Sequence, residues 1–119
     1  MTDKEDVLRV LRNVNDPEHP VSILDLDIVT ENDIEVDDDH VEVQFAPTVP
    51  FCPMGGAIGI VIKYALEKEL GLEAEVKVKP GAHVQEEMLN QTINDPESYQ
   101  ETLDRLRNSG LLDRCLQSP

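Results

Sequence analysis

The stretch from Val41 to Gly71, VEVQFAPTVPFCPMGGAIGIVIKYALEKELG, decides the fold. Its first part alternates apolar and polar side chains from Val41 to Phe45, which is typical of a half-buried strand. Its second part is almost continuously apolar from Met54 to Leu70, with only a narrow polar stripe. Gly71 then stands where a C-cap glycine belongs. The stretch therefore predicts a strand followed by a largely buried helix.

Three glycines stand in the first turns of this predicted helix, namely Gly55, Gly56 and Gly59. Each lowers the intrinsic stability of a helix. Their presence indicates that the helix backbone packs closely against another element, most simply the sheet. A phosphate-binding loop is a weaker interpretation, because the Lys-Ser/Thr ending of that motif is absent.

The residues before this stretch predict a helix, a loop and extended chain. Asp3 is well placed to cap a helix, and Pro17 stops this helix. Residues 26–30 and 34–36 are interpreted as one interrupted strand or as a pair of strands. Residues 37–39 are all aspartate, and we interpret them as a solvated hairpin tip because the spacing of a calcium loop is missing. The apolar residues at helical spacing are Val7, Val10, Leu11 and Val14.

The residues after it predict a third strand and two helices. Residues 73–79 alternate, residues 84–93 have helical spacing, and Asp95-Pro96 restarts a helix that ends at Gly110. The expected order is α-β-β-α-β-α-α. We predict a single α+β domain over residues 1–119, in which a small antiparallel or mixed sheet of about three strands packs against helices.

The charge of the chain excludes several classes of partner. Ten Lys and Arg residues against 25 Asp and Glu residues give a formal net charge of −15, which opposes binding to nucleic acid or to anionic membranes. The acids are spread along the chain, which favours a role in solvation over a role in binding one basic partner. The sequence has no apolar run of membrane-spanning length and no leader pattern, so we expect a cytoplasmic location.

Cys52 is the residue with the clearest chemical signal. It directly precedes Pro53, which suits the first position of a helix, so the thiol is expected near the helix N-cap. Unpaired backbone N–H groups and the helix dipole favour a thiolate there, the form that attacks electrophiles and binds metals. The alternative is a structural, buried cysteine. A disulfide to Cys115 is disfavoured in a reducing compartment.

A nucleophile or metal site needs partners, and the chain has three histidines. His40 lies in the acidic turn and is interpreted as solvated surface, whereas His19 lies in a proline-rich loop. His83 follows the last predicted strand, one turn before Glu86 and Glu87. If that strand ends beside Cys52, these residues are candidate co-ligands in one sphere that suits iron or zinc. The alternative is a set of unrelated polar residues.

Asp25 and Asp27 form a second candidate, because they flank Leu26 at the expected start of a strand. Paired-carboxylate catalysis would need both side chains on one side of the chain. Capping of loop N–H groups is the interpretation that we favour.

Three segments resemble the motifs of one known family. Residues 16–26, DPEHPVSILDL, are similar to its DPE-x-P-(V/L)-(S/T)-(I/L)-x-(D/E)-L opening, and residues 48–54, TVPFCPM, to its T-x-P-x-C-x-M segment. Residues 80–95 resemble its late PG-(T/A)-H-x-x-E…NKQL-x-D stretch, with Gln91 in place of the usual Lys. This is the small iron–sulfur cluster assembly family that includes SufT-like and PaaD-type proteins and the small component of the eukaryotic cytosolic cluster-targeting complex.

The resemblance is nearest to that eukaryotic component, and it implies a non-enzymatic factor that helps to mature cytosolic iron–sulfur proteins. Cys52 matches the reactive cysteine of the family, and His83 and Glu86 match its late polar positions. The implied cargo is an iron–sulfur cluster or iron, held transiently, with Cys52 and His83 as metal ligands and zinc as a substitute in vitro. Motif-supporting positions are Asp16, Glu18, Asp25, Thr48 and Pro53.

One thiolate per chain cannot complete a cluster site, which usually takes four cysteines. A bridged homodimer, a site shared with client or assembly proteins, or a purely adaptor role is therefore expected. A protein-interaction module with a structural Cys52 is the main alternative. A cysteine-dependent enzyme is a weaker one, because the sequence shows no base beside Cys52.

Overall fold

A computed structural model describes residues 3–15, 21–37, 40–46, 55–71, 73–81, 84, 86–110 and 112. In chain order the elements are α1 (Lys4–Arg12), the short 3-10 helix η1 (Glu31–Asp33), β1 (Ile34–Val36), β2 (His40–Phe45), α2 (Gly55–Leu70), β3 (Glu73–Val78), α3 (Glu86–Asn94) and α4 (Pro96–Ser109).

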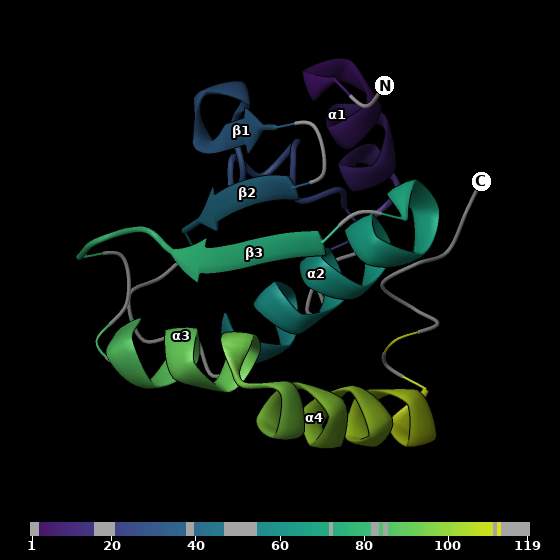
Figure 1. The fold of residues 1–119 in the computed structure, drawn as a ribbon, viewed down its shortest axis with the longest axis vertical. Helices are drawn as coiled ribbons and strands as arrows, with labels where there is room; N and C mark the ends of the chain where they lie inside the picture. Colours follow the sequence, from purple (N-terminus) through teal and green to yellow (C-terminus); the bar gives the residue numbers. More distant parts are fainter. Residues whose placement is uncertain are drawn as a thin grey trace.

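The predicted α+β class and the order α-β-β-α-β-α-α are confirmed. The sheet has the strand order β1-β2-β3, in which β1 runs antiparallel to β2 and β2 runs parallel to β3. The sheet is therefore mixed, and α2 makes the crossover between the two parallel strands. In Figure 1 the sheet lies in front of α2. In this view α3 and α4 lie below β3, and α1 lies beside β1.

The core lies between the sheet and the helices. The apolar residues of β2 and β3 alternate with polar ones, so that one face of each strand is buried and the other is partly exposed. α2 and α3 pack against β3, and α1 packs against α2 and β1. The buried strand residues are Val41, Val43, Phe45, Ala74, Val76 and Val78.

The helix ends follow the predicted capping signals. The side chains of Asp3 and Asp95 accept hydrogen bonds from the third backbone N–H group of α1 and α4, respectively. Gly71 and Gly110 follow α2 and α4 with φ of 66° and 81°, a left-handed conformation that glycine adopts without steric cost. The boundaries of these helices therefore follow from local sequence.

The prediction of a strand at residues 26–30 is wrong. Backbone N–H groups of Asp25 and Leu26 both donate to the carbonyl oxygen of Ser22, at 3.0 and 3.2 Å, which makes consecutive turns. Asp27 then adopts φ of 58°, a left-handed conformation that aspartate tolerates. Local turns therefore satisfy this backbone, and of the two predicted segments only residues 34–36 form a strand.

Gly59 confirms the predicted close packing of the α2 backbone. A Cβ atom at this position would lie 2.2 Å from Cδ1 of Ile93 and 3.0 Å from Cε1 of Phe45. Both neighbours are fully buried, so little space is free. The missing side chain lets the first turns of α2 approach the end of β2 and α3 together.

Helix side chains protect the outer edge of β3. An unpaired strand edge is a template for association with another chain, and natural proteins cover such edges. Here α2 and α3 supply hydrogen bonds to backbone groups that point away from β2. The contacts are Glu67 Oε2 with Ala74 N–H (3.4 Å), Lys63 Nζ with Ala74 O, Asn90 Oδ1 with Val78 N–H (2.7 Å) and Asn94 Nδ2 with Val76 O (3.0 Å).

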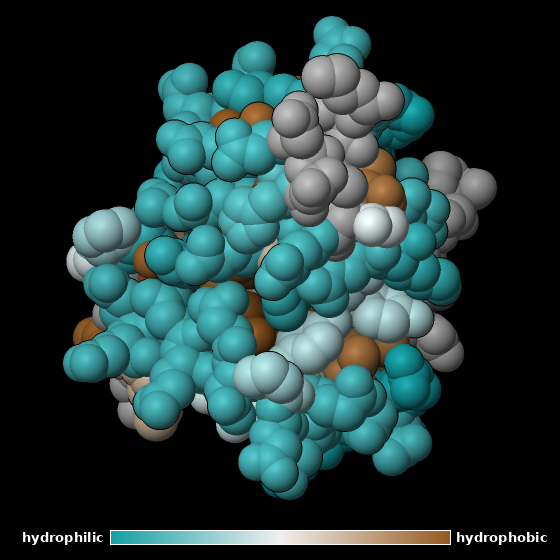
Figure 2. All heavy atoms as spheres, in the orientation of Figure 1, coloured by the Kyte–Doolittle hydropathy of each residue, from teal (hydrophilic) through white to brown (hydrophobic). Residues whose placement is uncertain are grey.

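The opposite face of the sheet is polar. Figure 2 shows this side of the molecule, which is mostly hydrophilic with small apolar patches. The residues that β2 and β3 direct there are His40, Glu42, Gln44, Glu73, Glu75 and Lys77. Within the described part of the chain, no helix is long and apolar enough to cross a membrane.

Candidate functional site at the carboxyl ends of β2 and β3

The carboxyl ends of the two parallel strands, after which two of the motif segments follow in sequence, lie at one edge of the sheet. Phe45 and Val78 are partners in the register, and the backbone N–H of Lys79 donates to the carbonyl oxygen of Phe45 at 2.8 Å. The end of β2, which precedes the second motif in sequence, therefore lies directly beside the end of β3, which precedes the third.

The first motif reaches the same edge through its last turns. The backbone N–H of Ala46 donates to the carbonyl oxygen of Ile28 at 2.8 Å, and the N–H of Ile28 donates to Ile23 O at 3.0 Å. Ile23 and Ile28 are fully buried, which holds this loop against the core. Segments that are far apart in sequence thus meet where β2 ends.

An ion pair between Asp33 and Lys79 spans this edge. Asp33 Oδ2 lies 2.8 Å from Lys79 Nζ and also accepts hydrogen bonds from the N–H and Oγ1 of Thr30, both at 2.9 Å. Burial by itself would raise the pKa of Asp33, but the hydrogen bonds from Lys79 and Thr30 outweigh it and hold the pKa below its usual value. The pair ties η1, before β1, to the end of β3.

Substitution of Asp33 by asparagine should lower the free energy of unfolding by about 1–2 kcal/mol at neutral pH, because a charged hydrogen bond is lost. A carboxylate with a depressed folded pKa contributes stability above its unfolded pKa of about 3.9 and loses it as the pH falls through the folded value. The difference between Asp33→Asn and wild type should therefore shrink below about pH 4. Urea titrations of both proteins at neutral pH and near pH 3 measure this difference in the free energy of unfolding.

Asp104→Asn is the matched control, because its partner Arg107 lies 3.5 Å away and both side chains are about half exposed. Exposed pairs of this kind contribute about 0–1 kcal/mol. Equal effects of the Asp33 and Asp104 substitutions at neutral pH would contradict the role of Asp33.

Glu86 and Asn90 fix the turn from β3 into α3. Glu86 Oε1 accepts from the backbone N–H of Gly81 at 2.7 Å, and Asn90 Oδ1 accepts from Val78 N–H at the same distance. Gly81 has φ of 80°, which favours glycine in this turn. One carboxylate oxygen of Glu86 is thus hydrogen-bonded to the backbone. Glu87 is exposed, and because adjacent helix positions point in different directions, it does not share a face with Glu86.

Most of the predicted site residues lie outside the described residues, namely Cys52, His83, Asp16, Glu18, Thr48, Pro53, His19 and Cys115. The described chain flanks Thr48, Cys52 and Pro53 at Ala46 and Gly55, and His83 at Gly81 and Val84. Asp25 and Asp27 are exposed, and no described residue forms a hydrogen bond with either carboxylate. The expected loop capping is therefore absent among the described residues, and a pair of the two carboxylates stays a prediction.

Sequence reasoning missed Asp33, Lys79 and Asn90 as residues that build this edge. Asn90 stands inside the third motif, so the motif itself was a signal of its importance. Asp33 and Lys79 have no local pattern that links them, because Asp33 ends η1 and Lys79 follows β3. Their pairing follows only from the strand order.

The exposed large apolar residues of the described chain all lie within two of the motif segments. Val21 belongs to the first motif and is 37% exposed, whereas Val84 and Met88 belong to the third and are 73% and 52% exposed. The helical spacing of Val84 and Met88 does not make a buried stripe; Ile93 is the buried residue of α3. These side chains offer apolar contact area to another protein.

Comparison with known proteins decides the family. A sequence model described as iron–sulfur cluster assembly protein matches residues 4–79, which is more than half of the chain. The chain belongs to the iron–sulfur cluster assembly protein family. The match confirms the resemblance of the motifs, and it spans the whole sheet of this family member.

Curated relatives extend the similarity of this iron–sulfur cluster assembly protein to nearly its full length. "Protein AE7" from Arabidopsis thaliana is 36% identical over 120 residues, which cover 98% of this chain and 76% of the relative. "Cytosolic iron-sulfur assembly component 2B" is 32% identical in Mus musculus, over 98% of this chain and 74% of the relative. The protein of that name in Dictyostelium discoideum is 35% identical, over 86% and 65%. The alignments with the Arabidopsis and mouse relatives, which cover 98% of this chain, also include the third motif.

Proposed function

We propose that this protein helps to mature cytosolic iron–sulfur proteins, as a targeting adaptor or transient carrier, with Cys52 as the thiolate at which cargo is exchanged. Membership of the iron–sulfur cluster assembly family carries the proposal. The names of the mouse and Dictyostelium relatives support the cytosolic setting and a partnership with the assembly machinery.

The edge at which the motifs meet supports the role of Cys52. The chain between Ala46 and Gly55 is tethered to the sheet at one end and to the first turn of α2 at the other. The first backbone N–H groups of a helix have no partner within the helix and stabilise negative charge. A thiol just before such a helix is favoured as thiolate, which is the form that ligates iron.

The number of ligands supports transfer over storage. A cluster usually needs four cysteine thiolates, whereas this chain has two cysteines in all. Cargo bound through Cys52, with His83 as a candidate co-ligand, would need further ligands from a client, an assembly protein or a second copy. Such a shared site releases its cargo more readily than a complete one.

A protein-interaction module with a structural Cys52 is the second candidate. The exposed side chains of Val21, Val84 and Met88 favour it, because they provide a binding surface that needs no thiol chemistry. Both candidates require that clients dock on this surface. They differ in whether cargo passes through Cys52.

Affinity isolation from native cells separates the candidates. Tagged wild type should capture iron–sulfur proteins together with iron. Cys52→Ala should capture the same proteins with much less iron. Val84→Ser/Met88→Ser should capture about tenfold less of these clients, which corresponds to a loss of about 1.4 kcal/mol in binding free energy. Mass spectrometry and iron analysis of the eluates are the measurements.

Glu97→Ser/Glu101→Ser is the matched control, because it changes two exposed residues at the same spacing on α4. It should capture clients as wild type does. Unchanged iron with Cys52→Ala would reject the transfer role and leave the interaction module. Unchanged capture with the Val84/Met88 variant would reject the docking surface.

A further inference from the structure

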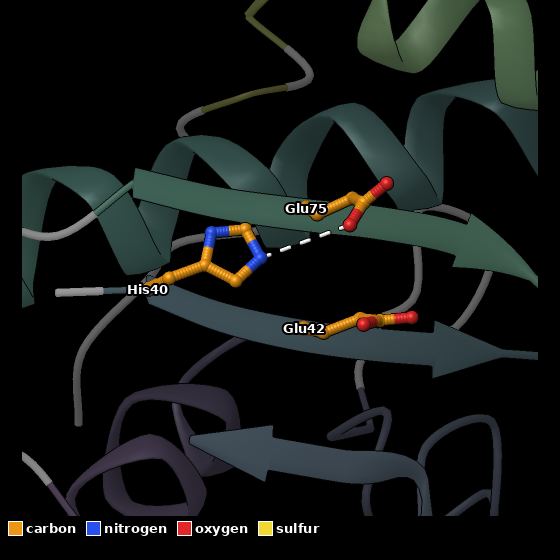
Figure 3. A group of neighbouring side chains, drawn as sticks. All are labelled: His40, Glu42 and Glu75. Atoms are coloured by element: carbon orange, nitrogen blue, oxygen red, sulfur yellow. Dashed lines mark ion pairs between the residues drawn. The ribbon is translucent and has the colours of Figure 1, made fainter. Parts of the chain in front are cut away.

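His40, Glu42 and Glu75 form a cluster on the open face of the sheet, shown in Figure 3. His40 and Glu42 are two residues apart on β2, so they point to the same face, and Glu75 is the register partner of Glu42 on β3. His40 is diagonal to Glu75, a separation that long side chains can bridge. All three residues are partly buried on paired strands.

The distances in this cluster approach those of a metal site. The Nε2 atom of His40 lies 3.7 Å from Oε2 of Glu75, and one ligand atom from each residue lies within 4.8 Å of the others. Two ligands at about 2.1 Å from a tetrahedral ion are about 3.4 Å apart. Shifts of up to about 1.4 Å, which are smaller than a rotamer change of a glutamate, would bring the three atoms from within 4.8 Å to that spacing.

The charges around the cluster favour a cation. Glu35, Glu42 and Glu75 form a row across all three strands, because Glu42 is the register partner of both others. Like charges directly opposite each other destabilise a sheet. Lys77 Nζ lies 3.1 Å from Oε1 of Glu75, which leaves Oε2 toward His40. Among the described residues, Glu42 has no salt bridge of its own, and Lys77, which also attracts Glu42, is paired with Glu75.

We propose that His40, Glu42 and Glu75 bind a late first-row divalent metal ion, such as Zn²⁺, at a site separate from the Cys52 edge. The site lies on the first half of β2 and β3, whereas the motif segments meet beyond the last residues of these strands. It does not depend on the proposed function, because none of its ligands belongs to the three motifs.

The ligand types define which ion fits. Imidazole and carboxylate together suit zinc and its neighbours, whereas Mg²⁺ and Ca²⁺ prefer oxygen ligands alone. Three protein ligands leave at least one position for water or an incoming ligand. Because both strands are paired along their length, the ligands are held on a rigid part of the fold.

NMR of the histidine side chains in the full-length protein tests the site. The chain has three histidines, so the imidazole signals of His40 can be followed separately while ZnCl₂ is added. Zn²⁺ should shift the His40 signals in a saturable manner. Glu42→Gln and Glu75→Gln should each weaken this binding about tenfold or more, since even the residues behind metal ligands contribute 10–100-fold.

Glu35→Gln is the matched control, because it removes the same charge from the same row of the sheet but lies outside the cluster. It should change zinc affinity at His40 by no more than about threefold, the effect expected of one screened surface charge. Absence of a His40 shift, equal weakening by Glu35→Gln and Glu75→Gln, or an equal shift with MgCl₂ would each overturn the proposal in favour of an ordinary acidic surface.

Discussion

Cells in which Cys52→Ala replaces the wild-type protein should show about a tenfold or greater loss of activity in their cytosolic iron–sulfur enzymes. Alanine removes the thiol of the second motif, and thiolate chemistry cannot proceed through a methyl group. Circular dichroism should show that the variant remains folded. Enzyme activity in extracts, normalised to the amount of each enzyme, measures the loss.

Cys115→Ala is the control for this prediction. It removes the other thiol of the chain, which lies outside the three motifs, and should leave client activity near the wild-type value. Equal losses with Cys52→Ala and Cys115→Ala would indicate a disulfide or a general requirement for both thiols. That outcome would contradict a specific exchange role for Cys52.

Gly59→Ala should destabilise the fold by up to about 2 kcal/mol, although alanine is the better helix former. Overpacking of a core costs about 1–3 kcal/mol, and the gain in helix propensity returns about 1 kcal/mol. The added methyl would overlap Cδ1 of Ile93 and press on Phe45, both fully buried. Thermal unfolding should shift down by about 4–8 °C, which circular dichroism can measure.

Ile93→Val removes the overlapping Cδ1 atom and should rescue this defect. Alone it should cost about 0.5–1.5 kcal/mol, but in the Gly59→Ala background the cost should fall by about 1 kcal/mol or more. Ile23→Val deletes the same group elsewhere in the core and should be additive with Gly59→Ala. Additivity of Gly59→Ala with Ile93→Val would show that the first turns of α2 do not depend on this contact.

The periodic and capped elements could be predicted from the sequence because their signals are local. Asp3, Asp95 and Gly71 mark helix ends through hydrogen bonds or backbone conformation within one turn. The alternation in β2 and β3 gives the buried face of each strand. Strand direction was left open, because a parallel and an antiparallel partner have the same alternation.

The errors arose where tertiary contacts or competing turns decide the structure. Residues 26–30 have a strand-like composition, but the backbone N–H groups of residues 26–28 donate to carbonyl oxygens of residues 22–24 in local turns. Val84 and Met88 have helical spacing, yet they remain exposed because Ile93 provides the contact of α3 with Phe45 and α2. Their exposure could be seen only once the position of α3 was known.

The candidate site was partly predictable. The motifs indicated which segments matter, and the parallel pairing of β2 with β3 places the end of β2, which precedes the second motif, beside the end of β3, which precedes the third. The Asp33–Lys79 pair and the His40–Glu42–Glu75 cluster were missed, because residues on different strands carry no shared local pattern. His40 was interpreted as solvated surface, and its neighbours on β3 give it a further role in our proposal.

The cluster content of one purified client protein tests the central claim most directly. The client is isolated from cells that contain wild type, Cys52→Ala or Cys115→Ala, and its iron and acid-labile sulfide are measured per polypeptide. We predict full occupancy with wild type and Cys115→Ala, and largely empty client with Cys52→Ala. Full client occupancy in the Cys52→Ala cells would contradict the exchange of cargo through this thiol.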